Sequence, residues 1–329
     1  MRRGMAGAVS AVSNTKKILS IDGGGIRGLI PALVLARIEE LTERRIAELF
    51  DVIAGTSTGG ILALGLTCRG QDGGPRYHAA DLAQMYVKDG RTIFPHECLG
   101  KVRQVFGPKY PAKGREEVLA EKLGDARLKD ALCEVIVTSY DIERRSPIFF
   151  RSALARESPE QDFLAREVAL ATSAAPTYFE PVRLTAPPPQ SAYALVDGGV
   201  FANNPGMCAF VDDTTVGGES ERTLMVSLGT GELTRKLPYA KAKGWGLAAW
   251  APRILDVVFD GVSDTVDYQL KTLLGGRYHR LQVELDRASD NMDDASKGNL
   301  EDLEREAEDL IQRSGKEIEK ICSELTAGV

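Results

Sequence analysis

The sequence predicts an α/β protein in which a largely parallel central sheet is covered by helices on both faces. Short apolar segments alternate with helix-length segments, which is typical of parallel strands joined by helical crossovers. Glycine-rich turns follow several strand segments, as they do at the ligand-binding edge of open α/β sheets. The 329-residue chain, with 43% hydrophobic residues, is long enough to form a sizeable core. The strand candidates span residues 18–21, 50–54, 133–139, 147–151, 193–196, 223–227 and 279–284.

The first strand candidate, KKILSI at residues 16–21, runs into the loop DGGGIRG and then into a helix predicted over residues 29–48. The backbone N–H groups of Gly23, Gly24 and Gly25 can point into one concavity, to which the helix N-terminus adds its positive dipole end. Such a nest stabilises a developing alkoxide. We therefore interpret this loop as an oxyanion hole.

The same loop also satisfies the dinucleotide-binding pattern G-x-G-x-x-G through Gly23, Gly25 and Gly28. In that class of protein an acidic residue ends the second strand and binds the ribose. Here the second strand candidate ends in glycine, threonine and serine, and Asp51 lies at its beginning, too early to reach a ribose. Dinucleotide binding is therefore the poorer explanation.

Arg27 is interpreted as an anchor of the loop or as a group that favours an anionic head group.

The second strand candidate leads into GTSTGG at residues 55–60, a G-x-S-x-G motif centred on Ser57. A serine nucleophile on a sharp strand-to-helix turn has this pattern, because the turn strains the serine backbone and exposes its hydroxyl at the top of a sheet. Gly55 and Gly59 leave room for the bend. An apolar segment precedes the motif and a helix-compatible one follows it. We therefore interpret Ser57 as a nucleophile rather than as part of an ordinary Gly/Ser turn.

The base that would activate Ser57 is predicted to be a carboxylate rather than a histidine. The chain has three histidines, His78, His96 and His279, and each is expected on the surface, in a loop or at a strand edge. Asp197 is the best candidate, because it ends the apolar segment YALV and is followed by two glycines. An aspartate with an ordinary pKa of about 3.9 is a weak base, but desolvation beside the serine would raise its basicity. The alternative is that Asp197 only caps a turn.

Together, DGGGIRG (residues 22–28), GTSTGG (55–60) and DGG (197–199) resemble the motifs of the patatin-like phospholipase family. The resemblance extends over about residues 16–285. It implies the three-layer α/β/α fold of that family and a reaction that needs no metal or other cofactor. Further segments that resemble plant patatins are GPKY (107–110), LGDARL (123–128), TSYDI (138–142), ATSAAPTYF (171–179), ANNP (202–205) and SLGTG (227–231).

The resemblance also implies a Ser-Asp dyad at Ser57 and Asp197, an oxyanion hole from the backbone of residues 23–25, and Arg27 in the basic position of the motif. The activity it implies is that of a lipid acyl hydrolase, of phospholipase A or lysophospholipase type, which cleaves glycerolipid esters through an acyl-enzyme. Two other functions stay open. One is a membrane-degrading effector of bacterial antiphage defence that a cyclic nucleotide activates, and the other is a storage or binding protein. The number of subunits stays open too.

The composition excludes some classes of partner and site. A net charge of −6 and a pI near 5.4 argue against a nucleic-acid polymer, which would need a basic face. The five cysteines are scattered without C-x-x-C spacing, so no disulfide framework or zinc site is expected and the cytoplasm is the default location. No apolar segment approaches the roughly 20 residues that span a bilayer. Trp245 and Trp250 lie in a segment that either contacts a membrane peripherally or packs in the core.

The two ends of the chain are expected to lie outside the catalytic domain. Residues 1–15 are interpreted as a disordered tail, residues 16–285 as the catalytic domain, and residues 286–329 as a C-terminal extension. The extension begins with a solvated acidic loop at residues 286–294. Apolar residues then recur at helical spacing up to Leu325 in an otherwise charged segment, which predicts an amphipathic helix packed on the body.

Overall fold

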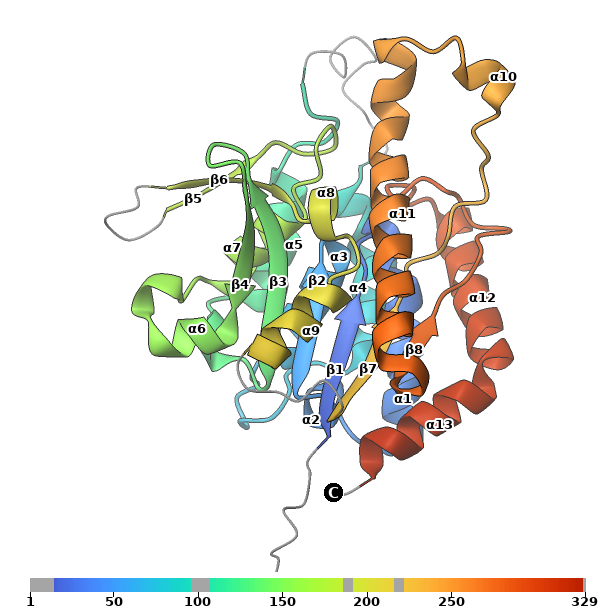
Figure 1. The fold of residues 1–329 in the computed structure, drawn as a ribbon. Coiled ribbons are helices and arrows are strands. Elements are labelled where there is room, and N and C mark those ends of the chain that lie inside the picture. Colours follow the sequence, from blue (N-terminus) through green and yellow to red (C-terminus); the bar gives the residue numbers. More distant parts are fainter. Residues whose placement is uncertain (1–14, 96–106, 186–191, 216–221, 328–329) are drawn as a thin grey trace, which may run out of the picture.

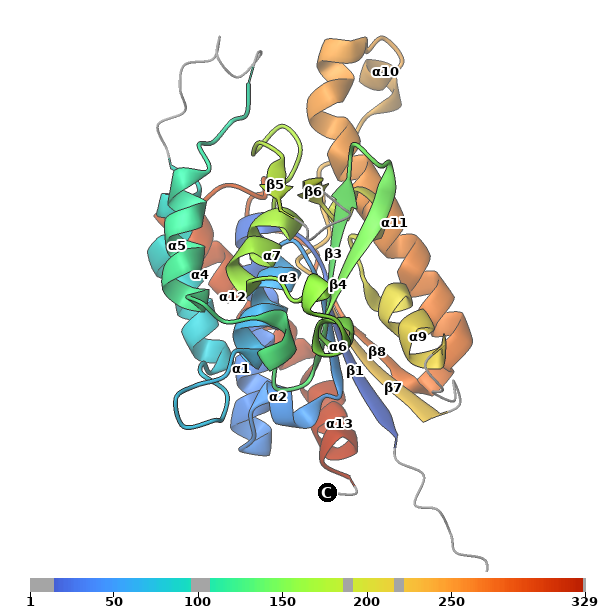
Figure 2. The same cartoon turned by 90° about the vertical axis from the view of Figure 1, so that its left-hand side faces the viewer.

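A mixed sheet of eight strands lies between two layers of helices in the computed structural model, which describes residues 15–95, 107–185, 192–215 and 222–327. Figure 1 shows the sheet from one side and Figure 2 shows the two layers. The predicted three-layer α/β/α architecture is confirmed. The strands are β1 (Lys16–Ile21), β2 (Val52–Thr56), β3 (Glu134–Asp141), β4 (Ser146–Arg151), β5 (Val182–Leu184), β6 (Tyr193–Asp197), β7 (Thr223–Leu228) and β8 (Tyr278–Leu281).

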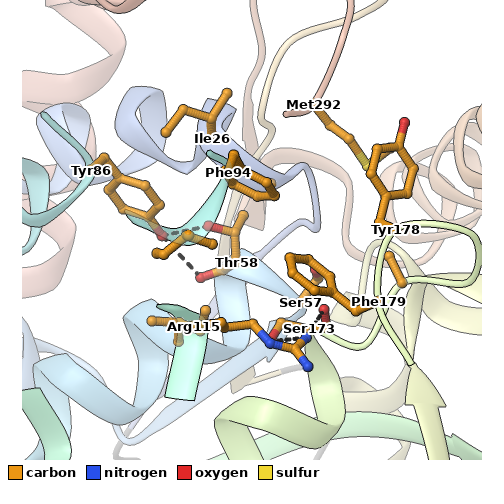
Figure 3. A pocket seen from close by; sticks show the side chains of 14 residues that line it. Ile26, Ser57, Thr58, Tyr86, Phe94, Arg115, Ser173, Tyr178, Phe179 and Met292 are labelled. Atoms are coloured by element: carbon orange, nitrogen blue, oxygen red, sulfur yellow. Dashed lines mark hydrogen bonds between the residues drawn. The ribbon is translucent and has the colours of Figure 1, made fainter. Parts of the chain in front are cut away.

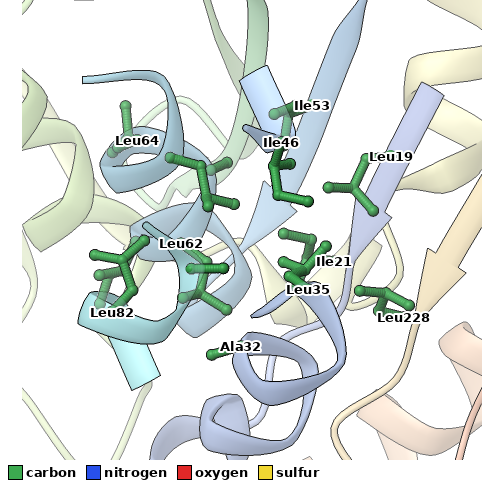
Figure 4. Packing of buried hydrophobic residues seen from close by; sticks show 14 of the residues in the cluster. Leu19, Ile21, Ala32, Leu35, Ile46, Ile53, Leu62, Leu64, Leu82 and Leu228 are labelled. Atoms are coloured by element: carbon green, nitrogen blue, oxygen red, sulfur yellow. The ribbon is translucent and has the colours of Figure 1, made fainter. Parts of the chain in front are cut away.

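Successive side chains along each strand point to opposite faces of the sheet, and a hydrophobic core lies on each face. Leu19 and Ile53 belong to the larger core, which Figure 4 shows together with Leu35 and Leu62. Ile18 belongs to the smaller core on the opposite face. This alternation follows from the two-residue period of a strand. The larger core packs under α1 (Leu29–Thr42), α3 (Thr58–Thr67), α4 (Ala79–Ile93), α5 (Lys113–Leu123) and α7 (Ala165–Thr172), and the smaller under α9 (Gly206–Thr215) and α11 (Leu247–Leu274).

The sheet is parallel in its larger part and antiparallel at one end. β3, β2, β1, β7 and β8 run parallel in that spatial order. β4 and β6 both run antiparallel to β3, and the short strand β5, which had no counterpart among the predicted strands, runs antiparallel to β6. The largely parallel sheet is therefore confirmed, although the strand that carries Asp197 is not one of the parallel strands.

β2 and β6 meet end to end along the same edge of β3. β4 occupies one edge of β3 from Ile136 to Asp141, and β2 occupies the other edge as far as the pair Thr56–Thr138. β6 then takes over this second edge, beginning with the pair Ser139–Asp197. Because β6 is antiparallel, its C-terminal end faces the C-terminal end of β2. The topology thus brings two chain ends that are far apart in sequence to one point.

Two predicted helices are each divided in the structure. The helix expected over residues 29–48 ends at Thr42, because Glu43 adopts a left-handed conformation with φ of 53°, and α2 (Ile46–Leu49) follows as a separate turn. The predicted C-terminal helix is divided at Ser314 into α12 (Lys297–Arg313) and α13 (Gly315–Thr326). The bend allows both helices to pack against α1. Other short helices are α6 (Ser152–Glu157), α8 (Gly199–Ala202) and α10 (Tyr239–Ala242).

The acidic loop at residues 286–294 is not simply solvated, contrary to the prediction. Met292 and Asp293 are buried, and Asp293 forms an ion pair with Lys109. The carbonyl oxygen of Met292 accepts the N–H of Ile26 at 2.8 Å, which ties this segment to the glycine-rich loop. The C-terminal segment therefore helps to build the surroundings of the predicted site.

Two further expectations concern the N-terminal tail and membrane-spanning helices. The predicted N-terminal tail lies outside the described residues except for Thr15. Within the described ranges, every helix is too short or too polar to cross a bilayer.

Candidate active site

Ser57 occupies the sharp turn between β2 and α3. Its backbone has φ of 54° and ψ of −121°, a conformation that non-glycine residues rarely adopt. Residues with such a strained backbone are often found at functional sites. The flanking glycines permit the bend by close approach: a Cβ atom on Gly55 would lie 2.1 Å from the carbonyl oxygen of Gly59. Thr172 holds the turn, because its Oγ1 accepts the N–H of Ser57 at 2.8 Å. The geometry is that of a nucleophile elbow.

Asp197 lies at the end of β6, where β6 meets the Ser57 turn. Its side chain is 1% exposed. The Oδ1 atom accepts the N–H of Gly199 at 2.7 Å, whereas Oδ2 accepts no hydrogen bond from any described residue. Burial raises the pKa of Asp197 to about 6, and the Ser57 hydroxyl, the Gly199 N–H and the charge of Arg115 act in the opposite direction. The carboxyl is therefore a stronger base than an exposed aspartate and still mostly ionised at pH 7.

The contact between the two side chains is close but not fully formed. The Ser57 hydroxyl is near enough to lower the pKa of Asp197, yet its approach does not satisfy the hydrogen-bonding capacity of Oδ2. Catalytic hydrogen bonds are often long or poorly aligned in the absence of substrate and tighten when it binds.

The glycine-rich loop lies beside the serine, but one of its three predicted donors is engaged. A Cβ atom on Gly23 would lie 3.2 Å from the Cβ of Ser57, so the loop and the elbow are in contact. The N–H of Gly23 donates to the carbonyl oxygen of Asn203 at 3.0 Å and is not free. The N–H groups of Gly24 and Gly25 donate to no group in the described part of the chain. The predicted oxyanion hole is thus reduced to two donors.

A pocket of ≈ 540 Å³, part of it open to solvent, leads to Ser57, and Figure 3 shows its lining. We call it the acyl pocket. Among its polar groups, the hydroxyls of Thr58 and Tyr86 bond to each other. Its walls are mainly apolar and include Ile26, Ile61, Ile93, Phe94, Phe179 and Met292.

Arg27 and Gly28 support the glycine-rich loop and do not line the acyl pocket. The Nε of Arg27, a residue that is 6% exposed, donates to the carbonyl oxygen of Gly24 at 3.3 Å. Burial lowers the pKa of Arg27, while nearby acids, of which Asp260 has the largest effect, act to raise it. These acids would repel an anionic head group, so the geometry favours the anchoring role. A Cβ atom on Gly28 would lie 2.2 Å from Thr58 Oγ1, which shows how tightly the loop packs on α3.

Of the histidines in the described ranges, neither His78 nor His279 lines the acyl pocket. His279 is 2% exposed, and its ring nitrogens bond to Glu317 and Glu324 of α13. His279 was expected at a strand edge and lies in the edge strand β8, but it is buried rather than exposed because α13 covers this strand. His78 is the residue before α4, and His96 lies outside the described residues.

Met292 and Arg115 are among the residues of the acyl pocket that were not singled out from the sequence. Met292 reaches the pocket from the C-terminal segment, and no local pattern signals this. Arg115 is 1% exposed and lies near Ser57, with its guanidinium next to Ser173. A signal for Arg115 does exist: it stands one helical turn before Val118 and Leu119, on the apolar face of α5.

Two features elsewhere in the molecule bear on earlier expectations. The rings of Trp245 and Trp250 pack edge to face with centroids 5.3 Å apart, and the guanidinium of Arg253 lies 4.7 Å from the Trp245 centroid. In the described ranges, no cluster of histidine, cysteine and acidic side chains is arranged to hold a metal ion. The cysteines in these ranges are all unbridged.

Comparison with known proteins identifies relatives along most of the chain. Residues 19–208 match the family model described as "Patatin-like phospholipase". Patatin-like protein 2 of Oryza sativa subsp. indica is 34% identical over 344 residues, which cover 90% of this chain and 84% of that protein. Patatin-like protein 2 of Arabidopsis thaliana is 34% identical with coverages of 91% and 84%, and patatin-04/09 of Solanum tuberosum is 34% identical with coverages of 90% and 83%. Among solved structures, VipD from Legionella pneumophila aligns with a TM-score of 0.35 and 12% identity over 90% of this chain and 67% of that one.

Proposed function

The chain belongs to the patatin-like phospholipase family, a family of lipid acyl hydrolases, and from this premise we propose that it cleaves glycerolipid esters with a Ser57–Asp197 dyad. The single observation that best supports the dyad is the end-to-end meeting of β2 and β6 on one edge of β3. It brings a strained serine and a buried carboxylate, remote in sequence, beside each other.

In the first half of the proposed reaction, Asp197 takes the proton of the Ser57 hydroxyl as the serine oxygen attacks the acyl carbonyl of the ester. The carbonyl oxygen becomes negative and accepts hydrogen bonds from the N–H groups of Gly24 and Gly25. A donor of this kind is worth about 3–4 kcal/mol in serine hydrolases. The intermediate then collapses: the ester C–O bond breaks, the departing alcohol takes the proton from Asp197, and the acyl group stays on Ser57.

In the second half, water replaces the alcohol. Asp197 takes a proton from the water molecule, whose oxygen attacks the acyl carbonyl. The same two amides stabilise the second negative intermediate. Collapse breaks the bond between Ser57 and the acyl carbon, and the proton held by Asp197 returns to the serine oxygen. A fatty acid is released and the enzyme regains its starting state.

The substrate class follows from the family and from the walls of the acyl pocket. Burying a methylene group is worth about 0.8 kcal/mol, so an apolar pocket next to the nucleophile favours a fatty-acyl chain over a short acyl group. We propose a phospholipase A or lysophospholipase specificity, with a phospholipid as the partner. The position of the cleaved ester is the property that the assay below measures.

The substrate would be met at a membrane surface. Figure 1 shows α10 and the first turns of α11 above the carboxyl ends of the parallel strands, the end at which Ser57 lies. Ile254 and Val257 of α11 are each 44% exposed, and Tyr239 of α10 is 82% exposed. Aromatic and apolar side chains of this kind partition to membrane interfaces. We propose that this projecting segment, with the Trp245–Trp250 pair where α10 is linked to α11, makes the peripheral contact of a cytoplasmic enzyme.

The proposal is tested by fatty-acid release from phosphatidylcholine with two different acyl chains, and by labelling with a fluorophosphonate. Ser57→Ala is expected to abolish labelling and to lower turnover to the detection limit, since loss of the serine costs about 10⁶-fold in a serine protease. Ser323→Ala, an exposed serine of α13, is the matched control and should retain both signals. Undiminished turnover in Ser57→Ala would sink the assignment.

The same assay separates the two alternative functions. An effector gated by a cyclic nucleotide would be nearly silent until a cyclic dinucleotide is added, whereas an enzyme without such gating would turn over at once. A storage or binding protein would show neither turnover nor stoichiometric labelling of Ser57.

A further inference from the structure

The acyl pocket contains a buried arginine that the reaction described above does not use. Arg115 is placed by α5 on the same helical face as the core residues Val118 and Leu119. Such a position normally carries an apolar side chain, because an arginine there loses its hydration. The Arg115 side chain instead extends along the base of the acyl pocket, and its guanidinium ends beside Ser57 and Ser173 (Figure 3). A charge at this depth needs an explanation.

The guanidinium is only partly satisfied by the protein. Its Nη1 donates to the carbonyl oxygen of Ser173, and its Cζ atom lies 4.1 Å from the ring centroid of Phe179. Its Nε and Nη2 atoms are buried and have no hydrogen-bond partner among the described residues. Buried donors are rarely left in this state, because each unsatisfied one costs about 1–3 kcal/mol. Arg115 is one of the residues that line the acyl pocket.

No carboxylate of the described residues accepts a hydrogen bond from the Nε or Nη2 atom of Arg115. Asp197, Glu116 and Glu180 are close enough for their charges to raise the pKa of Arg115, but none of them accepts a hydrogen bond from it. Burial lowers the pKa of Arg115 only to about 10, so the group stays positive at neutral pH. A permanent cation with free donors remains, therefore, in an apolar pocket.

We propose that Arg115 forms a carboxylate-binding subsite of the acyl pocket and that its ligand is a free fatty acid. The inference rests on the proposed function in one respect, because it takes this acid to be the reaction product. A planar guanidinium matches a carboxylate through two parallel N–H···O bonds. The acyl chain fits the apolar walls, and the carboxylate is generated at Ser57, next to the guanidinium. A neutral ester at the same place gains less from the charge, so the pocket holds the product more tightly than an uncharged analogue and the product inhibits turnover.

The test compares two ligands of equal length, octanoate and octanamide, by titration calorimetry at pH 8 with the unmodified protein. Octanoate is expected to bind at least about tenfold more tightly, the ratio that corresponds to a hydrogen bond with a charged partner. Arg115→Met should reduce this ratio to about one. Lys113→Met, which removes an exposed cation from the same helix, is the matched control for net charge and should leave the ratio unchanged.

Each outcome decides the matter. An equal affinity of the unmodified protein for both ligands would overturn the proposal, and so would an unchanged ratio in Arg115→Met. If Arg115→Met does not fold, Arg115→Lys is measured instead, because lysine keeps the charge but lacks the two parallel N–H groups of a guanidinium. The ratio of octanoate to octanamide affinity should then be lower than in the unmodified protein, and an unchanged ratio would count against the subsite. Binding of glycerophosphocholine that depends on Arg115, without a preference for octanoate, would assign the arginine to a phosphate instead. Because no turnover is needed, these results are independent of the Ser57→Ala test.

Discussion

Arg280 and Arg115 both lie near a buried aspartate at the edge of the sheet that carries the candidate site, but only Arg280 bonds to its aspartate. The two terminal nitrogens of Arg280 donate to the two oxygens of Asp22 at 3.1 and 2.6 Å, and one of them also donates to Ser227 at 2.9 Å. Burial would lower the pKa of Arg280, but the charge of Asp22 and their hydrogen bonds raise it above its usual range. Arg115 and Asp197 influence each other only through space.

From this difference we infer that Asp22 and Arg280 form a structural pair, and we propose that Asp197 and Arg115 form a functional one. Asp22 precedes the glycine-rich loop directly, and its bidentate pair with Arg280 fixes the end of β1 from which that loop departs. Asp197 keeps one oxygen without a partner, and Arg115 keeps two nitrogens without a partner, among the described residues. Unsatisfied groups destabilise the fold and are therefore expected where substrate chemistry needs them.

Replacing each aspartate by asparagine should produce the largest contrast. Asp197→Asn is expected to lower kcat/KM by about 10²–10⁴-fold, the contribution of a general base. Its melting temperature at pH 8 should be retained or raised. With the pKa of Asp197 raised from 3.8 to about 6, the ionised carboxyl costs the folded state about 3 kcal/mol above pH 6, and the amide does not carry this cost.

Asp22→Asn should show the reverse pattern in stability. It leaves Arg280 buried without a counter-charge, so a lower melting temperature is expected, measured by circular dichroism under the same conditions. If both variants lost stability equally, or if Asp197→Asn kept full activity, the division into a structural and a functional pair would be wrong.

Replacing each arginine by methionine should also give different losses in the free energy of unfolding, although the difference is smaller than that between the aspartate variants. Arg280→Met is expected to lower the free energy of unfolding by about 3–5 kcal/mol, because it leaves the Asp22 carboxylate uncompensated in the interior. Arg115→Met breaks no bond to a carboxylate and places an apolar side chain in an apolar wall, so it should cost distinctly less. Urea denaturation of both variants measures the difference, and equal losses would contradict it.

The local part of the candidate site could be predicted from the sequence, because its causes are local. The Ser57 turn requires two glycines that approach other backbone atoms closely, and both glycines are part of the G-x-S-x-G motif. The glycine-rich loop was found for the same reason. The alternation of strands and helices likewise indicated the layers of the fold.

The non-local part could not be derived in this way. Asp197 was expected to end a strand, and it ends β6, but the sequence did not indicate that β6 is antiparallel and reaches Ser57 because β3 extends past the end of β2. That overhang depends on pairing between segments about sixty residues apart. The engagement of the Gly23 N–H by Asn203 is of the same kind, since these residues lie far apart in the chain. Sequence patterns describe neighbours along the chain, and these contacts join neighbours in space.

The smallest effect expected from the comparison is a shift in pH dependence. Asp197 can act as a base only when ionised, so kcat/KM of the unmodified enzyme should fall as the pH decreases through about 6. The positive charge of Arg115 favours the ionised carboxyl, and its removal must raise the pKa of Asp197 further. In Arg115→Met the midpoint of the profile should therefore move to higher pH, while Lys113→Met leaves it in place. A midpoint that moved to lower pH would mean that Arg115 is not the charge that Asp197 senses, and the two groups would no longer form a set to compare with Arg280 and Asp22.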